Sequence, residues 1–139
     1  MTLAASAAAP GASAEILKLL EASTDPEFPA AFLVNRFRQF VRESFEIIPA
    51  AAAALAEGDL AEFGRQVDAS QFGAEQGLGN QVAETVHLAH RARALGAHAA
   101  SSFGAGFGGS VWAMVERDAV ESFGRAWMDD YRREFPAAA

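Results

Sequence analysis

Four glycines within six positions, at 104, 106, 108 and 109, separate two short segments whose apolar residues alternate. Alternation with a period of two is typical of β-strands, so residues 97–103 and 110–115 are predicted to form strands on either side of the glycines. Both faces of these strands are expected to be buried. Because a two-stranded sheet is rarely stable by itself, part of the sheet is expected to be missing from this chain.

The residues before the strands carry the spacing of amphipathic helices. Ser13 is the predicted N-cap of a short apolar helix, which the two prolines within residues 24–29 end. A long helix is predicted from Ala30, and Pro49 should kink or end it. Four large apolar side chains form one stripe of this helix and are expected in the core: Phe37, Val41, Phe45 and Ile48.

Further helices are predicted over the alanine run from residue 50, over residues 59–70 and 81–95, and in a C-terminal stretch that Pro136 ends. Their predicted caps are Gly58, Asp59 with Glu62, Asn80, Gly96 and Asp118 with Glu121. In the last helix a second core stripe recurs every four residues at Phe123, Trp127 and Tyr131. Together these patterns predict a helix-rich α+β domain with a small antiparallel sheet.

Composition bounds the size of the domain and the kind of core it can build. The chain has 139 residues, of which 51% are hydrophobic, which is enough for one domain. Alanine contributes 33 residues and phenylalanine 11, so an aromatic core is expected, with alanine chiefly favouring helices. Residues 1–12 are rich in Ala and Ser and are expected to be a disordered tail, which leaves 13–139 as the folded domain.

Charge and residue types exclude several classes of function. The 11 basic residues against 18 acidic ones give a net charge of −7, which disfavours nucleic acid and anionic membranes as partners. The lack of cysteine excludes disulfides, thiolate catalysis and thiolate metal sites. Residues 1–14 lack the basic start and the apolar run of a signal peptide, and no apolar stretch approaches transmembrane length, so a cytoplasmic location is expected.

The glycine segment is the strongest candidate for chemistry. Successive glycines allow positive φ angles and can direct several backbone N–H groups into one concavity, an arrangement that binds phosphate without lysine. A dinucleotide-binding fingerprint requires a helix after the glycines, whereas a strand is predicted here. A protein-kinase loop fits locally, but no lysine and no HRD or DFG sequence follows. The Gly-Lys-Ser/Thr ending of a P-loop is missing too, and a plain tight hairpin is the simplest alternative.

The sequence LGAHAASSFGAGFGGSVWAMV, residues 95–115, closely resembles the third motif of the GHMP small-molecule kinases, and most of all that of the galactokinases. Other stretches similar to the galactokinase C-terminal domain are RFRQFVRE at 36–43, GDLAEFG at 58–64, Ser70, and LGNQVAETVHLAHRA from 78. The resemblance covers most of the chain. It departs from the family at three positions, with Gln71 in place of the usual histidine, Ser101 where Lys or Arg is frequent, and Phe103 in place of a small hydroxyl residue.

This resemblance implies the C-terminal domain of a sugar kinase, of a ferredoxin-like type that lacks some of the family's strands. The complete enzyme would transfer a phosphoryl group from ATP, with Mg²⁺, to the hydroxyl of a sugar such as galactose. The cofactor-binding residues implied here are Gly104, Gly106, Gly108, Gly109 and Ser110, which would help to shape a phosphate site. The family's catalytic aspartate and Ser-rich phosphate loop belong to an N-terminal domain that has no counterpart here, so no catalytic residue is assigned and the isolated chain is expected to be inactive.

A non-catalytic role is the second hypothesis. The chain would then be a stand-alone ligand-binding or oligomerisation module that associates through unpaired strand edges. In a complete enzyme the expected small-molecule partners are ATP and a sugar such as galactose. The expected protein partner is either a second copy of the chain or a separate N-terminal kinase domain.

Two polar clusters have ordinary explanations. Glu84, His87 and His90 share one helix face and could bind iron or zinc, but a solvated surface is the simpler interpretation, and no metal site is assigned. Asp129 and Asp130 lie late in the last helix, and nothing in the sequence places a base or nucleophile near them.

Overall fold

The computed structural model describes residues 11–104 and 106–137, which form α-helices and one two-stranded antiparallel sheet. The elements in chain order are α2 (Ala12–Glu21), α3 (Ala30–Arg42), the π-helix η1 (Glu43–Ile47), α4 (Ile48–Glu57), α5 (Leu60–Gly73), the π-helix η2 (Ala74–Leu78), α6 (Ala83–Ala94), β1 (Ala99–Phe103), β2 (Ser110–Met114), the 3₁₀ turn η3 (Arg117–Ala119) and α7 (Val120–Glu134). The predicted helix-rich α+β class is confirmed. The expected disordered tail lies almost entirely outside the described residues.

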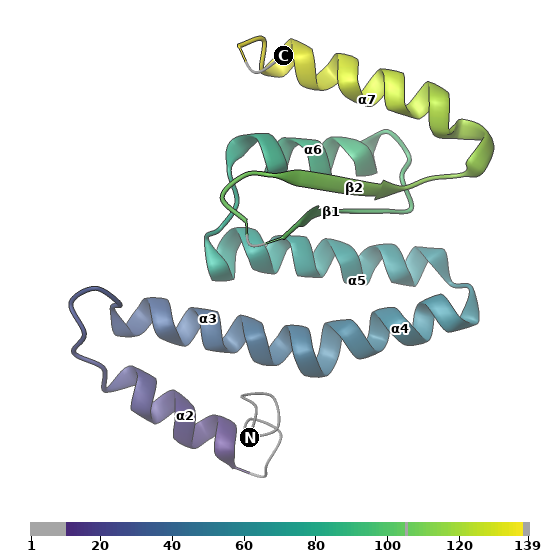
Figure 1. The fold of residues 1–139 in the computed structure, drawn as a ribbon. Coiled ribbons are helices and arrows are strands. Elements are labelled where there is room, and N and C mark those ends of the chain that lie inside the picture. Colours follow the sequence, from purple (N-terminus) through teal and green to yellow (C-terminus); the bar gives the residue numbers. More distant parts are fainter. Residues whose placement is uncertain (1–10, 105, 138–139) are drawn as a thin grey trace.

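The elements stack in layers along the molecule (Figure 1). Helices α3 and α4 form one nearly continuous rod, with α2 packed on its N-terminal half. Helix α5 lies between this rod and the sheet, while α6 and α7 lie on the far side of the sheet. Among the described residues, no helix has the length and apolar character needed to cross a membrane.

Several helix ends follow the local signals in the sequence. The backbone N–H of Glu62 donates to the side chain of Asp59 at 2.8 Å, so Asp59 caps α5 as predicted. Gly58 and Gly96 adopt positive φ angles of 75° and 99° just after α4 and α6, which confirms both as helix ends. Helix α5 extends past Ser70 to Gly73.

Three predicted N-caps are wrong. Helix α6 begins at Ala83, beyond Asn80, and the N–H of Val82 is satisfied by the hydroxyl of Thr85 at 3.3 Å. Asn80 instead contacts the glycine segment, a tertiary role that its sequence neighbourhood does not reveal. Gly11 takes the cap position of α2 that Ser13 was expected to fill, and at α7 a 3₁₀ turn ending in Ala119 replaces a cap by Asp118.

The stripe predicted on the long helix is interrupted by η1. A π-helical turn holds extra chain per turn, so it rotates all later side chains relative to an α-helical pattern. Phe37 is buried as expected, but Phe45 and Ile48 are 40% and 56% exposed, and Ile47 takes the buried position. Pro49 does not end the rod: it occupies the first turn of α4, directly after η1, where the rod bends (Figure 1).

The expectation of an aromatic core is also wrong. Phe37 is the one phenylalanine among the buried apolar residues of the described chain, and most of the others are alanines: Ala54, Ala89, Ala92, Ala97, Ala99 and Ala100. Small residues are required because the backbones approach closely. A Cβ atom added to Gly64 of α5 would lie 2.1 Å from the carbonyl oxygen of His98, just before β1. Most phenylalanines therefore lie at the margins of these contacts.

The hairpin forms close to the predicted limits. Strand β1 pairs with β2 from Ala99 opposite Met114 to Phe103 opposite Ser110. The first residues of β1 are fully buried, whereas every residue of β2 from Val111 onward is half-buried, so the expected burial of both faces is only partly met. Ala113 and Val115 face the alanine cluster that α6 and α7 cover.

Helix α7 is attached to α6 through Trp127 and Asp130. The indole N–H of Trp127 donates to the carbonyl of Leu88 at 2.9 Å. The buried carboxylate of Asp130 accepts two hydrogen bonds from Arg91, at 2.8 and 3.1 Å, and lies 2.9 Å from the ring nitrogen Nε2 of His87. Hydrogen bonds from Arg91, and after it from Arg133 and His87, lower the pKa of Asp130 to about 2.

We expect the stability of the protein to fall between about pH 4 and about pH 2 because Asp130 becomes protonated. Its folded pKa of about 2 lies below the ordinary value of 3.8, so the ionised form favours the folded state above that range, and this stabilisation is lost as the pH falls through it. Thermal unfolding of the wild type and of Asp130→Asn from pH 2 to 6 measures the effect. The variant should unfold several degrees lower at pH 6, and the difference should shrink towards pH 2. A constant difference would contradict the assignment.

Candidate functional site

The glycine segment forms an open loop between β1 and β2. Positive φ angles occur at Gly104 (95°), Gly106 (88°), Gly108 (113°) and Gly109 (105°), and also at Phe107 (60°). Four of these five positions need glycine, because a side chain is strained at such angles. The sequence prediction of a loop that requires several glycines is therefore met, and Ser110 begins β2 at its end.

One side of the loop is open. A Cβ atom added at Gly104 or Gly108 would meet nothing within 4 Å. Phe103 and Phe107 are 70% and 73% exposed beside it. At Gly104 and Gly108 the described part of the loop thus leaves open space where an anion or another protein segment can approach the backbone.

The other side of the loop rests on Asn80. The N–H of Phe107 donates to the carbonyl oxygen of Asn80 at 2.5 Å. A Cβ atom at Gly106 would lie only 2.2 Å from that same oxygen. Gly106 is therefore required for close packing against Asn80, whereas the space beside Gly104 and Gly108 is open.

Gln71 of α5 fixes the strand that leads into the loop. Its buried side-chain oxygen accepts from the hydroxyl of Ser101 at 3.0 Å and from the N–H of Ser102 at 2.8 Å. Its side-chain NH₂ group donates to Glu75 at 2.9 Å. In the sequence, Gln71 is notable only as a departure from the galactokinase pattern. Its role could not be predicted because its partners lie 30 residues away along the chain.

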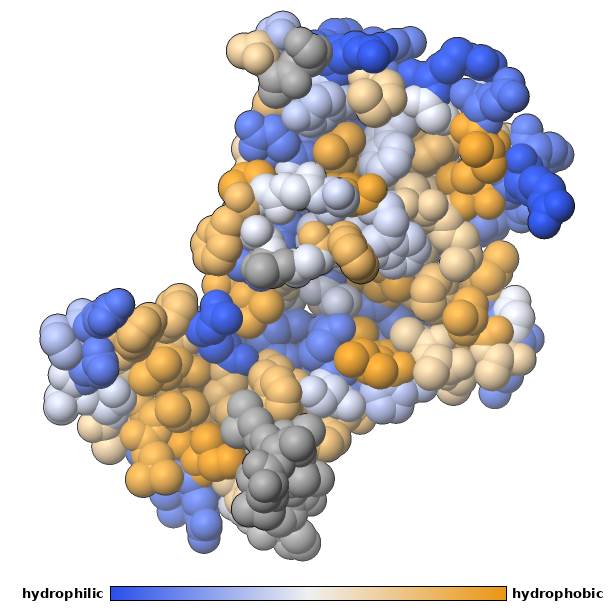
Figure 2. All heavy atoms as spheres, viewed as in Figure 1, coloured by the Kyte–Doolittle hydropathy of each residue, from blue (hydrophilic) through white to orange (hydrophobic). Residues whose placement is uncertain are grey.

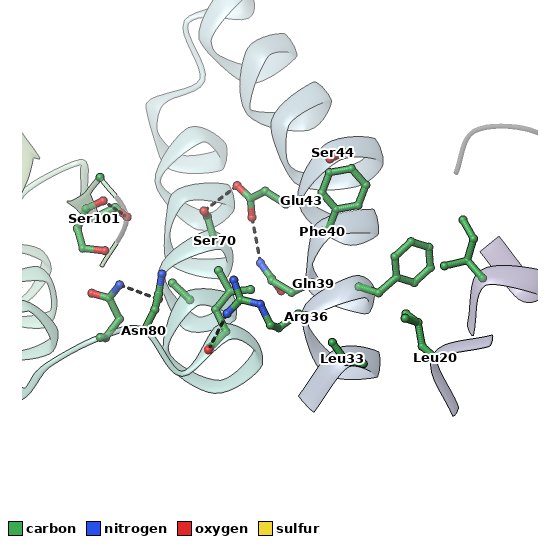
Figure 3. A pocket seen from close by; sticks show the side chains of 17 residues that line it. Leu20, Leu33, Arg36, Gln39, Phe40, Glu43, Ser44, Ser70, Asn80 and Ser101 are labelled. Carbon is green, nitrogen blue, oxygen red and sulfur yellow. Dashed lines mark hydrogen bonds between the residues drawn. The ribbon is translucent and has the colours of Figure 1, made fainter. Parts of the chain in front are cut away.

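A pocket of about 660 Å³ opens beside the loop, between α2, α3, η2 and β1 (Figure 3). Glu43 lies at its polar end, where the hydroxyl of Ser70 donates at 2.8 Å and the amide of Gln39 at 3.1 Å. Its apolar wall comes from Ile16, Leu20, Leu33, Phe37 and Phe40. Figure 2 shows apolar side chains gathered over the region of α2 and the start of α3. Gly104, Ser101, Ser102 and Asn80 also line the pocket, so pocket and loop are continuous.

The sequence gives no signal for this pocket. Gly73 and Gly77 are spaced four apart on a helical segment and face Gln39, but they line a neighbouring pocket. A Cβ atom at Gly73 would overlap the Gln39 amide. Two glycines on one helix face indicate close approach of another element, which here is α3.

The helix-face cluster considered as a metal site does not converge. His87 Nε2 lies 2.9 Å from Asp130, whereas His90 Nε2 lies 3.0 Å from Glu75 on a different helix. In the part of the chain that the structure describes, no three His, Cys, Asp or Glu side chains are placed to hold a metal ion. His87 and His90 instead tie α6 to α7 and η2.

Comparisons with known proteins match this fold and site. The family model described as "GHMP kinases C terminal" matches residues 51–133. Galactokinase from Ligilactobacillus salivarius (strain UCC118) is 40% identical over 111 residues, in an alignment that covers 75% of this chain and 28% of that protein. Galactokinase from Pyrococcus furiosus is 30% identical over 99 residues, with 71% of this chain and 28% of the relative covered.

A solved structure is similar as well. The crystal structure of Lactococcus lactis galactokinase complexed with galactose matches with a TM-score of 0.71 and 28% sequence identity, and covers 86% of this chain and 31% of that chain. The present chain thus spans less than a third of the length of these relatives. Because the family model matches more than half of the sequence, the chain belongs to the GHMP kinases and corresponds to their C-terminal region.

Proposed function

We propose that the chain serves as the C-terminal domain of a galactokinase-like sugar kinase, which transfers a phosphoryl group from ATP to a sugar hydroxyl. The glycine loop carries this proposal, because it combines the glycine pattern of the family with open space beside Gly104 and Gly108. Phosphoryl transfer depends mainly on positioning and on electrostatic stabilisation, so a rigid loop that holds phosphate oxygens contributes directly to the reaction.

In this proposal the backbone around Gly104, Gly106, Gly108 and Gly109, with Ser110, holds phosphate oxygens of ATP. The open space at Gly104 and Gly108 leaves room for a phosphate group, and uncharged backbone N–H donors can bind anions. ATP supplies the phosphoryl group, and Mg²⁺ neutralises charge on it when bound. The described residues hold no carboxylate cluster for Mg²⁺, so its ligands are assigned to the rest of the enzyme and to the nucleotide.

The isolated chain is expected to show no kinase activity. The chain spans less than a third of its galactokinase relatives, so most of the residues of a complete galactokinase lie outside it. A fusion enzyme tests this: residues 11–139 replace the matching C-terminal region of the Ligilactobacillus salivarius galactokinase. We expect galactose-dependent ADP formation from the fusion enzyme, and none from residues 11–139 or from the remaining Ligilactobacillus region alone. ADP formation by the isolated chain, or a folded but inactive fusion enzyme, would contradict the proposal.

A second candidate function is an oligomerisation module, and one observation favours it. The outer edge of β1 is covered by α5 and by side chains, because Gln71 binds the N–H of Ser102 and Arg93 binds the carbonyls of Ala97 and His98 at 2.5 and 2.6 Å. Within the described ranges, nothing pairs with the outer edge of β2. A β2-to-β2 dimer would fill that edge. Light scattering at micromolar concentration distinguishes the cases, since a strict monomer excludes this function.

A further inference from the structure

The glycine loop is held from outside the hairpin. Regular pairing between β1 and β2 ends at Phe103 opposite Ser110, so residues 104–109 lie beyond the last paired residues. Among these residues, the described hydrogen bond to the rest of the protein is the one from the N–H of Phe107 to Asn80. The shape of the loop therefore depends on a residue more than twenty positions upstream.

The hydrogen bond to Asn80 holds the backbone of Phe107 in an unfavourable conformation. A φ of 60° is uncommon for a bulky residue and costs energy unless the surroundings enforce it. The side chain of Phe107 is 73% exposed, so packing of its ring does not hold the backbone at this φ. The backbone is held by the hydrogen bond to Asn80 and by the tight fit of Gly106 against the same residue.

Asn80 is itself well fixed. It is buried in the short connection between η2 and α6, and its N–H donates to the carbonyl of Ala74 at 3.4 Å. Its side-chain oxygen accepts from Gln81 at 3.0 Å, and Gln81 accepts from Thr85 at 2.9 Å. Asn80 also lines the pocket, where Figure 3 shows it on the side of Ser101. The carbonyl of Asn80 is thus a rigid support under a loop that has few contacts of its own.

We propose that Asn80 is a positioning residue for the glycine loop: its carbonyl group and its contact with Gly106 hold residues 106–109 in the conformation that receives phosphate. The part that concerns phosphate rests on the proposed function, whereas the part that concerns loop conformation does not. The two parts are tested separately.

The first test uses the full chain and amide hydrogen exchange followed by NMR. In the wild type, the Phe107 amide should exchange more slowly than the amides of Gly108 and Gly109, for which the described residues provide no acceptor. Equal exchange at the three amides would overturn the proposal without any substitution.

Matched glycine variants then separate the contact from the backbone strain. Gly106→Ala and Gly104→Ala impose nearly the same positive φ on alanine, at 88° and 95°, but only the Cβ atom at 106 meets Asn80. We expect Gly106→Ala to reduce the protection of Phe107 by about three- to tenfold, the value of one hydrogen bond, and Gly104→Ala to retain most of it. Equal losses in both variants would mean that strain, not Asn80, sets the loop.

The second test uses the fusion enzyme and Asn80→Asp, which keeps the shape and the backbone carbonyl but places a negative charge beside the loop. We expect the KM for ATP to rise about tenfold while the KM for galactose is unchanged, because the added charge repels phosphate and not a neutral sugar. The matched control is Gln76→Glu, which adds the same charge on the exposed part of η2. An equal change in both KM values, or an equal effect of the control, would mean that no phosphate lies beside Asn80 and would contradict the part of the proposal that concerns phosphate. An inactive wild-type fusion would refute the proposed function and not the exchange result.

Discussion

Gly64→Ala is expected to destabilise the protein by about 3 kcal/mol or more, at the upper end of what overpacking in a core costs. The added methyl group would lie 2.1 Å from the carbonyl oxygen of His98, well inside van der Waals contact. The oxygen cannot move away freely, because Arg93 binds it at 2.6 Å and β1 follows immediately. The clash must therefore be relieved by moving α5 away from β1, which disrupts the alanine-lined contact between them.

Gly124→Ala is the matched control for this substitution. Gly124 lies inside α7, its φ is ordinary, and an added Cβ atom there meets nothing within 4 Å. The same chemical change should stabilise the protein by about 0.5–1 kcal/mol through helix propensity. Thermal unfolding measures both, and the two midpoints should differ by about 10 °C for a chain of this size. If Gly64→Ala unfolds with the wild type, the close packing of α5 on β1 is wrong.

Gln71→Leu is expected to destabilise the protein by about 2–4 kcal/mol, because several buried polar groups lose partners at once. Leucine fills a similar volume but cannot accept from Ser101 and Ser102 or donate to Glu75. The loss should be largest at the end of β1, so the Ser102 amide should lose protection from hydrogen exchange.

Gln76→Leu is the control for that substitution, because Gln76 lies on η2 but is exposed. Its free energy of unfolding should change by about 0.5 kcal/mol or less. Gln71→His, which restores the residue usual in galactokinases, should recover part of the lost stability if one ring nitrogen accepts from Ser102. Denaturant unfolding gives the free energy of unfolding of the three variants. Similar values for Gln71→Leu and Gln76→Leu would contradict the stabilising role of Gln71.

The features that the sequence predicted correctly are those that depend on near neighbours. Asp59 caps α5 through a residue three positions away, and Gly58 and Gly96 end helices through their own backbone angles. The glycine loop was also evident, because several closely spaced glycines between two alternating segments have few other uses.

The features that were missed depend on distant partners. Gln71 bonds to β1 across 30 residues, and Asp130 bonds to α6 across about 40, so neither role leaves a local pattern. Asn80 has the residue type of an N-cap and was interpreted as one, but its carbonyl supports the glycine loop. The π-helical turn η1 also has no clear sequence signal, and Phe45 and Ile48 leave the expected core stripe within it and directly after it.

The open face of the glycine loop gives the most direct test of the account. Gly108→Ala adds a methyl group at a position where no described atom lies within 4 Å. It also places alanine at a φ of 113°, which alanine tolerates poorly. The measurement is the KM for ATP of the fusion enzyme with and without this substitution, alongside the KM for galactose. The account predicts a rise of about tenfold or more for ATP and little change for galactose, since the methyl group and the altered backbone disturb donors aimed at phosphate. An unchanged KM for ATP in a folded, active fusion enzyme would contradict the claim that this loop holds the nucleotide.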